Sequence, residues 1–101
     1  MNNKHYILND KHEIIEVDFM TWGRFFNYAE NRRVALDEVN GKKISTVFLG
    51  IDHNFEEGEP LLFETMVFGK DEEDCERYST WKEAEEGHKK MVEKYKLKNT
   101  I

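Results

Sequence analysis

The dipeptide Asn40–Gly41 restricts the fold of this chain more than any other feature. It separates two runs with strand-like alternation, residues 33–39 and 42–52. A two-residue hairpin loop of type I′ needs positive φ at both positions, and Asn-Gly is well suited to this. The loop length also sets the register of the two strands. It predicts three cross-strand pairs, namely Val39 with Lys42, Leu36 with Ser45, and Val34 with Val47.

The two faces of this hairpin differ in character. One face is the more aliphatic and carries Val34, Leu36, Val47, Leu49 and Ile51. The other face is mixed and carries Ala35, Asp37, Thr46 and Phe48. Because one face of an antiparallel sheet commonly packs on the core and the other meets water, we expect the aliphatic face to be the core side.

Two amphipathic helices are expected. Asp18 has the position of an N-cap before an aromatic helix over residues 19–29. The side chains that fall on one arc of this helix are Phe19, Trp22, Phe25, Phe26 and Ala29. Thr80 and Glu83 have the spacing of a capping box at the start of a second helix, from about Trp81 to Lys96. Each helix therefore presents one apolar stripe to a core.

The remaining segments complete an α+β pattern. Residues 6–8 and 13–17 predict a short hairpin, residues 61–68 are apolar on both faces as in an interior strand, and residues 71–74 predict an acidic turn. The order ββαβββα predicts one antiparallel sheet of about five strands with two helices packed on one face. The length predicts a single domain over residues 1–101.

Charge and cysteine content restrict partner and compartment. The net charge is −6 with a sequence pI near 5.2, which argues against direct nucleic-acid binding through a cationic surface. The single cysteine, Cys75, excludes an intramolecular disulfide and fits a reducing compartment. The polar N-terminus predicts no secretory signal, and no apolar run has the length of a membrane span. A cytoplasmic protein with no membrane association is expected.

Three positions break the pattern around them. His88 lies at the centre of the apolar stripe of the last helix, Glu64 lies inside the most apolar strand, and Asp52–His53 closes an apolar strand. A buried histidine needs a hydrogen-bond partner, so His88 is either a satisfied core residue or a site residue. Gly87 beside it is costly in a helix, which fits a close approach of a strand, a loop or a ligand.

A convergence of Asp52, His53, Glu64 and His88 would make a hard-metal or general acid–base site. The chain has no H-x-x-x-H, H-E-x-x-H or C-x-x-C motif that would require a metal. The chain is rich in aromatic residues, most of which are expected in the core. Tyr28 falls off the buried arc of the first helix and Phe55 lies in a polar loop, and an exposed set of this kind would mark a partner surface or a stacking pocket for a base-like ligand. The candidate binding residues are Asp52, His53, Phe55, Glu64, Trp81 and His88.

Three blocks of the sequence resemble a family of small uncharacterised proteins encoded by bacteriophages and prophages. The blocks are STVFLGIDHNF at residues 45–55, LLFETMVF at residues 61–68, and YSTWKEAEEGH at residues 78–88. The resemblance implies a phage setting and the cytoplasm of a bacterial host. It implies no catalytic residue.

A small non-enzymatic binding protein is therefore expected, one that inhibits or sequesters a component of host defence. Its partner would be a host protein or a small nucleotide, and no cofactor is expected. The acidic segments 56–59 and 71–76 favour a basic protein partner. Two alternatives stay open. One is a small metal-dependent hydrolase that uses Asp52, His53, Glu64 and His88, and the other is a minor phage structural component that forms a homo-oligomer.

Overall fold

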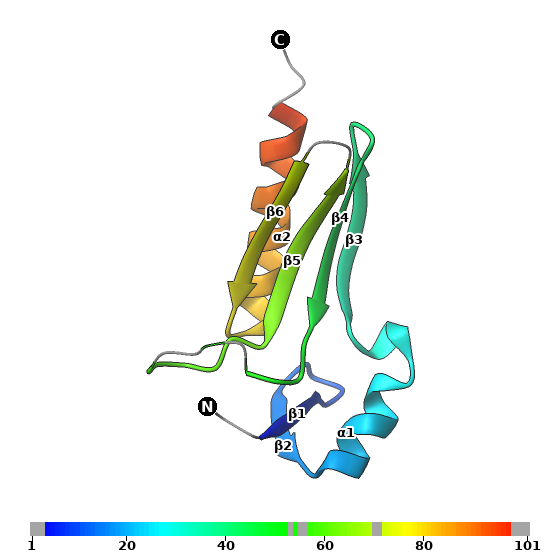
Figure 1. Cartoon of the computed structure of the whole chain (residues 1–101), viewed down its shortest axis with the longest axis vertical. Coiled ribbons are helices and arrows are strands. Elements are labelled where there is room, and N and C mark those ends of the chain that lie inside the picture. The colour runs from blue at the N-terminus through cyan, green and yellow to red at the C-terminus, as the bar shows by residue number, and fades with distance from the viewer. Residues whose placement is uncertain (1–3, 53, 55–56, 70–71, 98–101) are drawn as a thin grey trace.

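The fold is α+β, with two separate antiparallel sheets (Figure 1). The computed structural model describes residues 4–52, 54, 57–69 and 72–97. The elements are, in order, β1 (His5–Leu8), β2 (Ile14–Val17), α1 (Phe19–Phe26), the 3₁₀ turn η1 (Ala29–Asn31), β3 (Arg33–Val39), β4 (Lys42–Phe48), β5 (Phe63–Gly69), β6 (Glu72–Tyr78) and α2 (Trp81–Leu97). Strands β1 and β2 form one sheet, and the order in the other is β3-β4-β5-β6. The expected class is confirmed, but the single five-stranded sheet is wrong.

One strand was missed because it is highly charged. Residues 71–74 were expected to form a turn, but residues 72–78 form β6, which pairs along its length with β5. An edge strand tolerates charge because only one side of its backbone is bonded to a neighbour. The charge of β6 is therefore compatible with its place at the edge of the sheet.

Helix α2 alone covers one face of the four-stranded sheet (Figure 1). Its sheet-facing side chains Ala84, His88, Met91 and Tyr95 are buried. No described element covers the other face, which we call the open face. The expectation of two helices on one face is wrong, because α1 lies with β1 and β2 beyond the end of this sheet. Helix α1 also ends at Phe26, three residues earlier than expected, although Asp18 does cap it by accepting a hydrogen bond from the Thr21 amide.

The Asn40–Gly41 hairpin is confirmed, with φ of 52° and 79° at the two residues. Val39 pairs with Lys42 and Leu36 pairs with Ser45, as the loop predicts. The third pair is wrong, because a β-bulge between Arg33 and Ala35 shifts the register and places Arg33 opposite Val47. At the bulge, β3 therefore contains one more residue than the segment of β4 that it pairs with.

The assignment of the hairpin faces is also wrong. Thr46 and Phe48 are buried beneath α2, whereas Leu36 on the opposite face is 43% exposed. The mixed face is the core side because it holds the polar partners of His88, which are described below. The same alternation places Thr65 beneath α2 and Glu64 on the open face.

The small lobe of β1, β2 and α1 joins the sheet through aromatic packing. Phe25 and Phe26 of α1 lie with ring centroids 6.0 Å from Phe48. Gly50, with φ of 72°, lies against Phe26 and Trp22, and a Cβ there would come within 2.6 Å of both side chains. A glycine is therefore required where β4 leaves the sheet. In the described part of the chain, no helix has both the length and the apolar content needed to span a membrane.

Candidate functional site

His88 is a fully partnered core residue. It is 3% exposed, and its two ring nitrogens lie 2.7 Å from Asp37 Oδ2 and 2.6 Å from Thr46 Oγ1. The Nε2 atom faces the carboxylate, so Nε2 carries the proton in the neutral ring and Nδ1 accepts from the threonine hydroxyl. Of the two alternatives for His88, the structure therefore shows the satisfied core histidine, and its partners are Asp37 and Thr46.

The hydrogen bonds continue across the sheet as a chain. The Thr46 and Thr65 hydroxyl oxygens are 2.5 Å apart, and the Tyr78 hydroxyl donates to Thr65 Oγ1 at 3.1 Å. With neutral His88, the Tyr78 hydroxyl donates to Thr65, and each threonine hydroxyl accepts once and donates once, so that the bonds run from Tyr78 through Thr65 and Thr46 to His88 and Asp37. We call this set the hydroxyl chain. It connects β6 to β3 beneath α2.

The hydroxyl chain contains an Asp–His–hydroxyl arrangement, but it cannot act on a substrate as it stands. A catalytic hydroxyl must reach a reacting carbon, and both Thr46 and Thr65 are 0% exposed. Every one of its polar groups already has a partner, which is how buried polar groups stabilise a core. The chain is therefore a structural feature of the core.

Glu64 lies on the other side of the sheet from His88. Its carboxylate accepts from Arg77 Nε at 3.0 Å and from Cys75 Sγ at 3.4 Å. Partial burial, together with the Glu64 carboxylate, raises the pKa of the Cys75 thiol. The sheet separates Glu64 from His88, so the convergence that a hydrolase would need does not occur. Among the described residues, no group of three His, Cys, Asp or Glu side chains could hold a metal ion.

The other predicted site residues lie near the lobe. Asp52 Oδ1 accepts from the backbone amides of Asn54 and Leu61, so it holds the two ends of a loop together. Trp81 begins α2 and stacks on the His12 ring at a centroid distance of 3.6 Å. His53 and Phe55 lie outside the described residues. The six predicted residues therefore do not form one site among the described positions.

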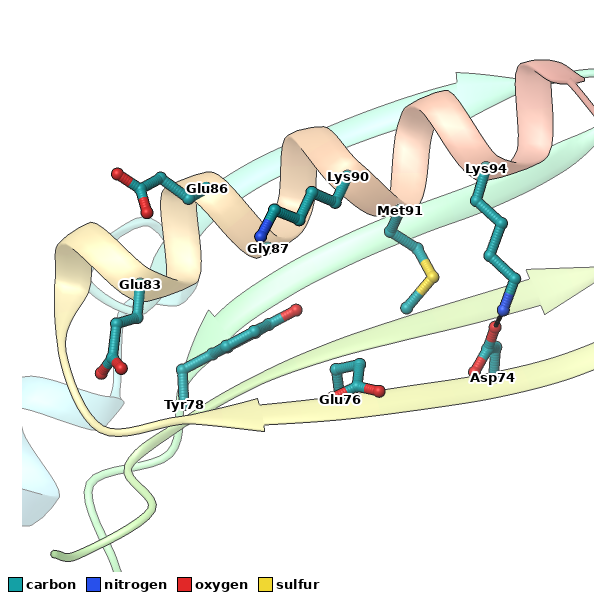
Figure 2. Close-up of a pocket in the computed structure, with 9 residues that line it drawn as sticks. All are labelled: Asp74, Glu76, Tyr78, Glu83, Glu86, Gly87, Lys90, Met91 and Lys94. Atoms are coloured by element: carbon teal, nitrogen blue, oxygen red, sulfur yellow. Dashed lines mark hydrogen bonds and ion pairs between the residues drawn. The ribbon is translucent and has the colours of Figure 1, made fainter.

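A groove of about 460 Å³ lies between α2 and the edge strand β6 (Figure 2). Tyr78 and Met91 lie between the helix and the strand, and Gly87 lies above the Tyr78 ring (Figure 2). A Cβ at position 87 would come within 2.3 Å of the ring and its hydroxyl. Gly87 thus permits the close approach that the sequence suggested, and the approaching group is Tyr78 of β6.

Charged side chains line the groove. Four carboxylates and two ammonium groups border it, from Asp74, Glu76, Glu83, Glu86, Lys90 and Lys94. Lys94 donates to Asp74 at 2.6 Å, which lowers the pKa of that carboxyl below its usual value, and Glu83 caps the helix by accepting from Thr80. Within the described part of the chain, the side chains of Glu76, Glu86 and Lys90 make no hydrogen bond or ion pair. These three charges are available to a partner.

Sequence reasoning missed Asp37, Thr46, Thr65 and Tyr78 as members of the His88 environment. A signal was present, because Thr46 and Thr65 are polar residues that each lie two positions from large apolar residues on the same face of the strand, namely Ile44 and Phe48 on β4 and Phe63 and Val67 on β5. No protein-family profile, curated protein sequence or solved structure matches this chain.

Proposed function

We propose that this chain is a small non-enzymatic binding protein that captures a polypeptide partner along β6. On the resemblance to phage proteins, the partner is a component of the bacterial host, and the inhibition of a host defence in the cytoplasm is the biological role. The observation that carries the proposal is the groove beside an uncovered edge strand. It combines a backbone edge that no described strand pairs with and three charged side chains that are unpaired among the described residues.

The edge of β6 supports recognition by strand addition. Strand β6 is the last strand of its sheet, and no described strand pairs with its outer side. An extended peptide that adds to such an edge gains backbone hydrogen bonds, and its alternate side chains enter any neighbouring groove. The groove beneath α2 lies on that side of β6 (Figure 2).

The charge of the groove favours a basic peptide. Its lining carries four carboxylates against two ammonium groups, and Glu76 and Glu86 are unpaired among the described residues. Like charges placed directly opposite each other destabilise a strand pair, so two copies of β6 are poorly suited to pair with each other. A segment rich in Lys or Arg gains complementary contacts instead.

Site-specific photo-crosslinking tests the proposal. A photoreactive benzoylphenylalanine in place of Lys90 faces the groove, and the same group in place of the exposed neighbour Lys89 lies outside its lining. With full-length protein in bacterial lysate, we expect position 90 to give a crosslinked protein band that position 89 does not give. The band should be lost when Glu76 and Glu86 are both changed to Lys, and kept when Glu85 is changed to Lys.

Two outcomes would count against this function. If positions 89 and 90 give the same bands, the groove is not the binding surface. If no band depends on Glu76 and Glu86 while circular dichroism shows both variants folded, the proposed charge recognition is wrong.

A further inference from the structure

A second pocket, on the open face, has the opposite charge. It has a volume of about 280 Å³ and lies where η1 leads into β3, with β4 at its side. Its polar lining is Arg32, Arg33, Lys43 and Ser45, and its apolar lining includes Leu36 and Val47. No carboxylate lines it, although the chain as a whole carries a net charge of −6. We call it the cationic pocket.

The β-bulge places one of these cations. In a regular ladder, Ala35 beneath α2 would put Arg33 on the same buried side, two residues away. The extra residue inserted between Arg33 and Ala35 places Arg33 opposite Val47, on the open face. Bulges commonly redirect a side chain in this way, often next to functional sites. The β-bulge, which makes the predicted pairing of Val34 with Val47 wrong, therefore also places Arg33 at the pocket.

Arg32 is held in place but incompletely partnered. Its backbone carbonyl accepts from the Phe48 amide at 2.7 Å, and its guanidinium carbon lies 5.4 Å from the centre of the Phe26 ring. Its Nε is buried, and no acceptor for it occurs within the described residues. A buried donor without an acceptor costs about 1–3 kcal/mol. An anionic ligand in the pocket would bring acceptor oxygens to this side chain.

The other polar groups of the pocket are also unpaired. Within the described part of the chain, Arg33, Lys43 and the Ser45 hydroxyl make no ion pair or side-chain hydrogen bond. By register, two carboxylates on the same face lie next to the lining: Glu38 is directly opposite Lys43, and Glu64 is directly opposite Val47. Neither is part of the lining, and Glu38 forms no ion pair with Lys43. Arg33 also lines a neighbouring pocket that Asp10 and Glu30 border. Three cationic residues and one hydroxyl-bearing residue therefore line a small space that also has an aliphatic wall.

We propose that the cationic pocket binds the phosphate group of a small phosphorylated ligand, such as a nucleoside monophosphate. Guanidinium and ammonium groups form charge-assisted hydrogen bonds with phosphate oxygens, and Ser45 supplies a neutral donor. Leu36 and Val47 provide an apolar surface for the body of the ligand. The pocket is at the small end of ligand sites, which suits a mononucleotide better than a larger cofactor. The acidic remainder of the chain disfavours a long nucleic acid.

Titrations followed by NMR test this proposal, with adenosine monophosphate, inorganic phosphate and adenosine as probes. We expect the amide signals of Arg33 and Ser45 to shift with the first two probes and not with adenosine. Arg33→Gln and Lys43→Gln should each weaken the binding of adenosine monophosphate by about fivefold to tenfold. Arg24→Gln removes an exposed cation outside the pocket and should leave the affinity unchanged. Glu38→Gln should strengthen binding by about twofold.

Several results would overturn the inference. One is the absence of saturable binding by adenosine monophosphate and inorganic phosphate up to about 5 mM. Another is an equal response to adenosine, because the site would then recognise the nucleoside. A third is a single-stranded oligonucleotide that binds more than about tenfold tighter than the mononucleotide, since this would indicate a nucleic-acid surface. The test does not depend on the groove at β6, so it stands if the proposed polypeptide partner fails.

Discussion

The contact between Gly87 and Tyr78 makes a sharp prediction about stability. In most helices, Gly→Ala in the interior stabilises by about 1 kcal/mol because glycine loses more backbone freedom on folding. At position 87 the added Cβ would come within 2.3 Å of the Tyr78 Cε1, Cζ and hydroxyl atoms. The ring would have to move, and its hydrogen bond to Thr65 would be strained or broken.

The free-energy cost of the clash can be compared with the gain in helix propensity. Overpacking of this kind costs about 1–3 kcal/mol, and the loss of one hydrogen bond costs about 1 kcal/mol. After the gain of about 1 kcal/mol from helix propensity, we expect Gly87→Ala to destabilise the fold by about 1–3 kcal/mol. For a domain of this size, the melting temperature should fall by at least about 4 °C. Thermal unfolding followed by circular dichroism measures the change.

Two matched controls separate the clash from other effects. Gly23 also lies in a helix, but a Cβ there meets nothing within 4 Å, so Gly23→Ala should stabilise. In a Tyr78→Leu background, which removes the clashing atoms but keeps an apolar side chain, Gly87→Ala should become neutral or stabilising. Tyr78→Phe retains Cε1 and Cζ and should not relieve the clash. If Gly87→Ala raises the melting temperature in the wild-type chain as Gly23→Ala does, the packing argument is refuted.

Three further predictions concern the polar network and the titrating groups. Thr46→Val should destabilise by about 1–3 kcal/mol in urea denaturation, because it leaves His88 Nδ1 buried without a donor, whereas Thr46→Ser should cost only about 1 kcal/mol. The lowered pKa of Asp74 means that its stabilising effect is full above the unfolded-state pKa and is lost as pH falls through the folded-state value, so Asp74→Asn should flatten the fall in melting temperature below about pH 4. Cys75 should react slowly with iodoacetamide at pH 7.5 (roughly one unit below its usual pKa) because its pKa is raised, and Glu64→Gln should speed the reaction as followed by mass spectrometry.

Local signals in the sequence predicted local structure well. The hairpin at Asn40–Gly41, the N-cap at Asp18 and the capping box of Thr80 with Glu83 are all present. Each depends on residues within a few positions of one another, so no knowledge of the tertiary fold is needed. The class followed from the order of these elements.

The predictions that were wrong concern features that depend on contacts between residues far apart in the sequence. Aliphatic content does not predict the core side of this hairpin, because Asp37 and Thr46 lie on the face toward α2, where both are bonded to His88. His88 is 51 residues from Asp37 along the chain. No periodicity within either segment could join them. The convergence of Glu64 and His88 that the hydrolase alternative requires is absent for the same reason, since alternation along β5 places Glu64 on the open face.

The net charge of the chain likewise concealed the cationic pocket. A net charge sums over all residues, but at physiological ionic strength the influence of an exposed charge falls off over about 8 Å. A ligand in the pocket therefore responds mainly to Arg32, Arg33 and Lys43, and only weakly to the carboxylates of β6 at the opposite edge of the sheet. The acidic groove lies beside β6 and the cationic pocket beside β3 and β4. One small sheet can therefore present two oppositely charged sites that are too far apart to neutralise each other.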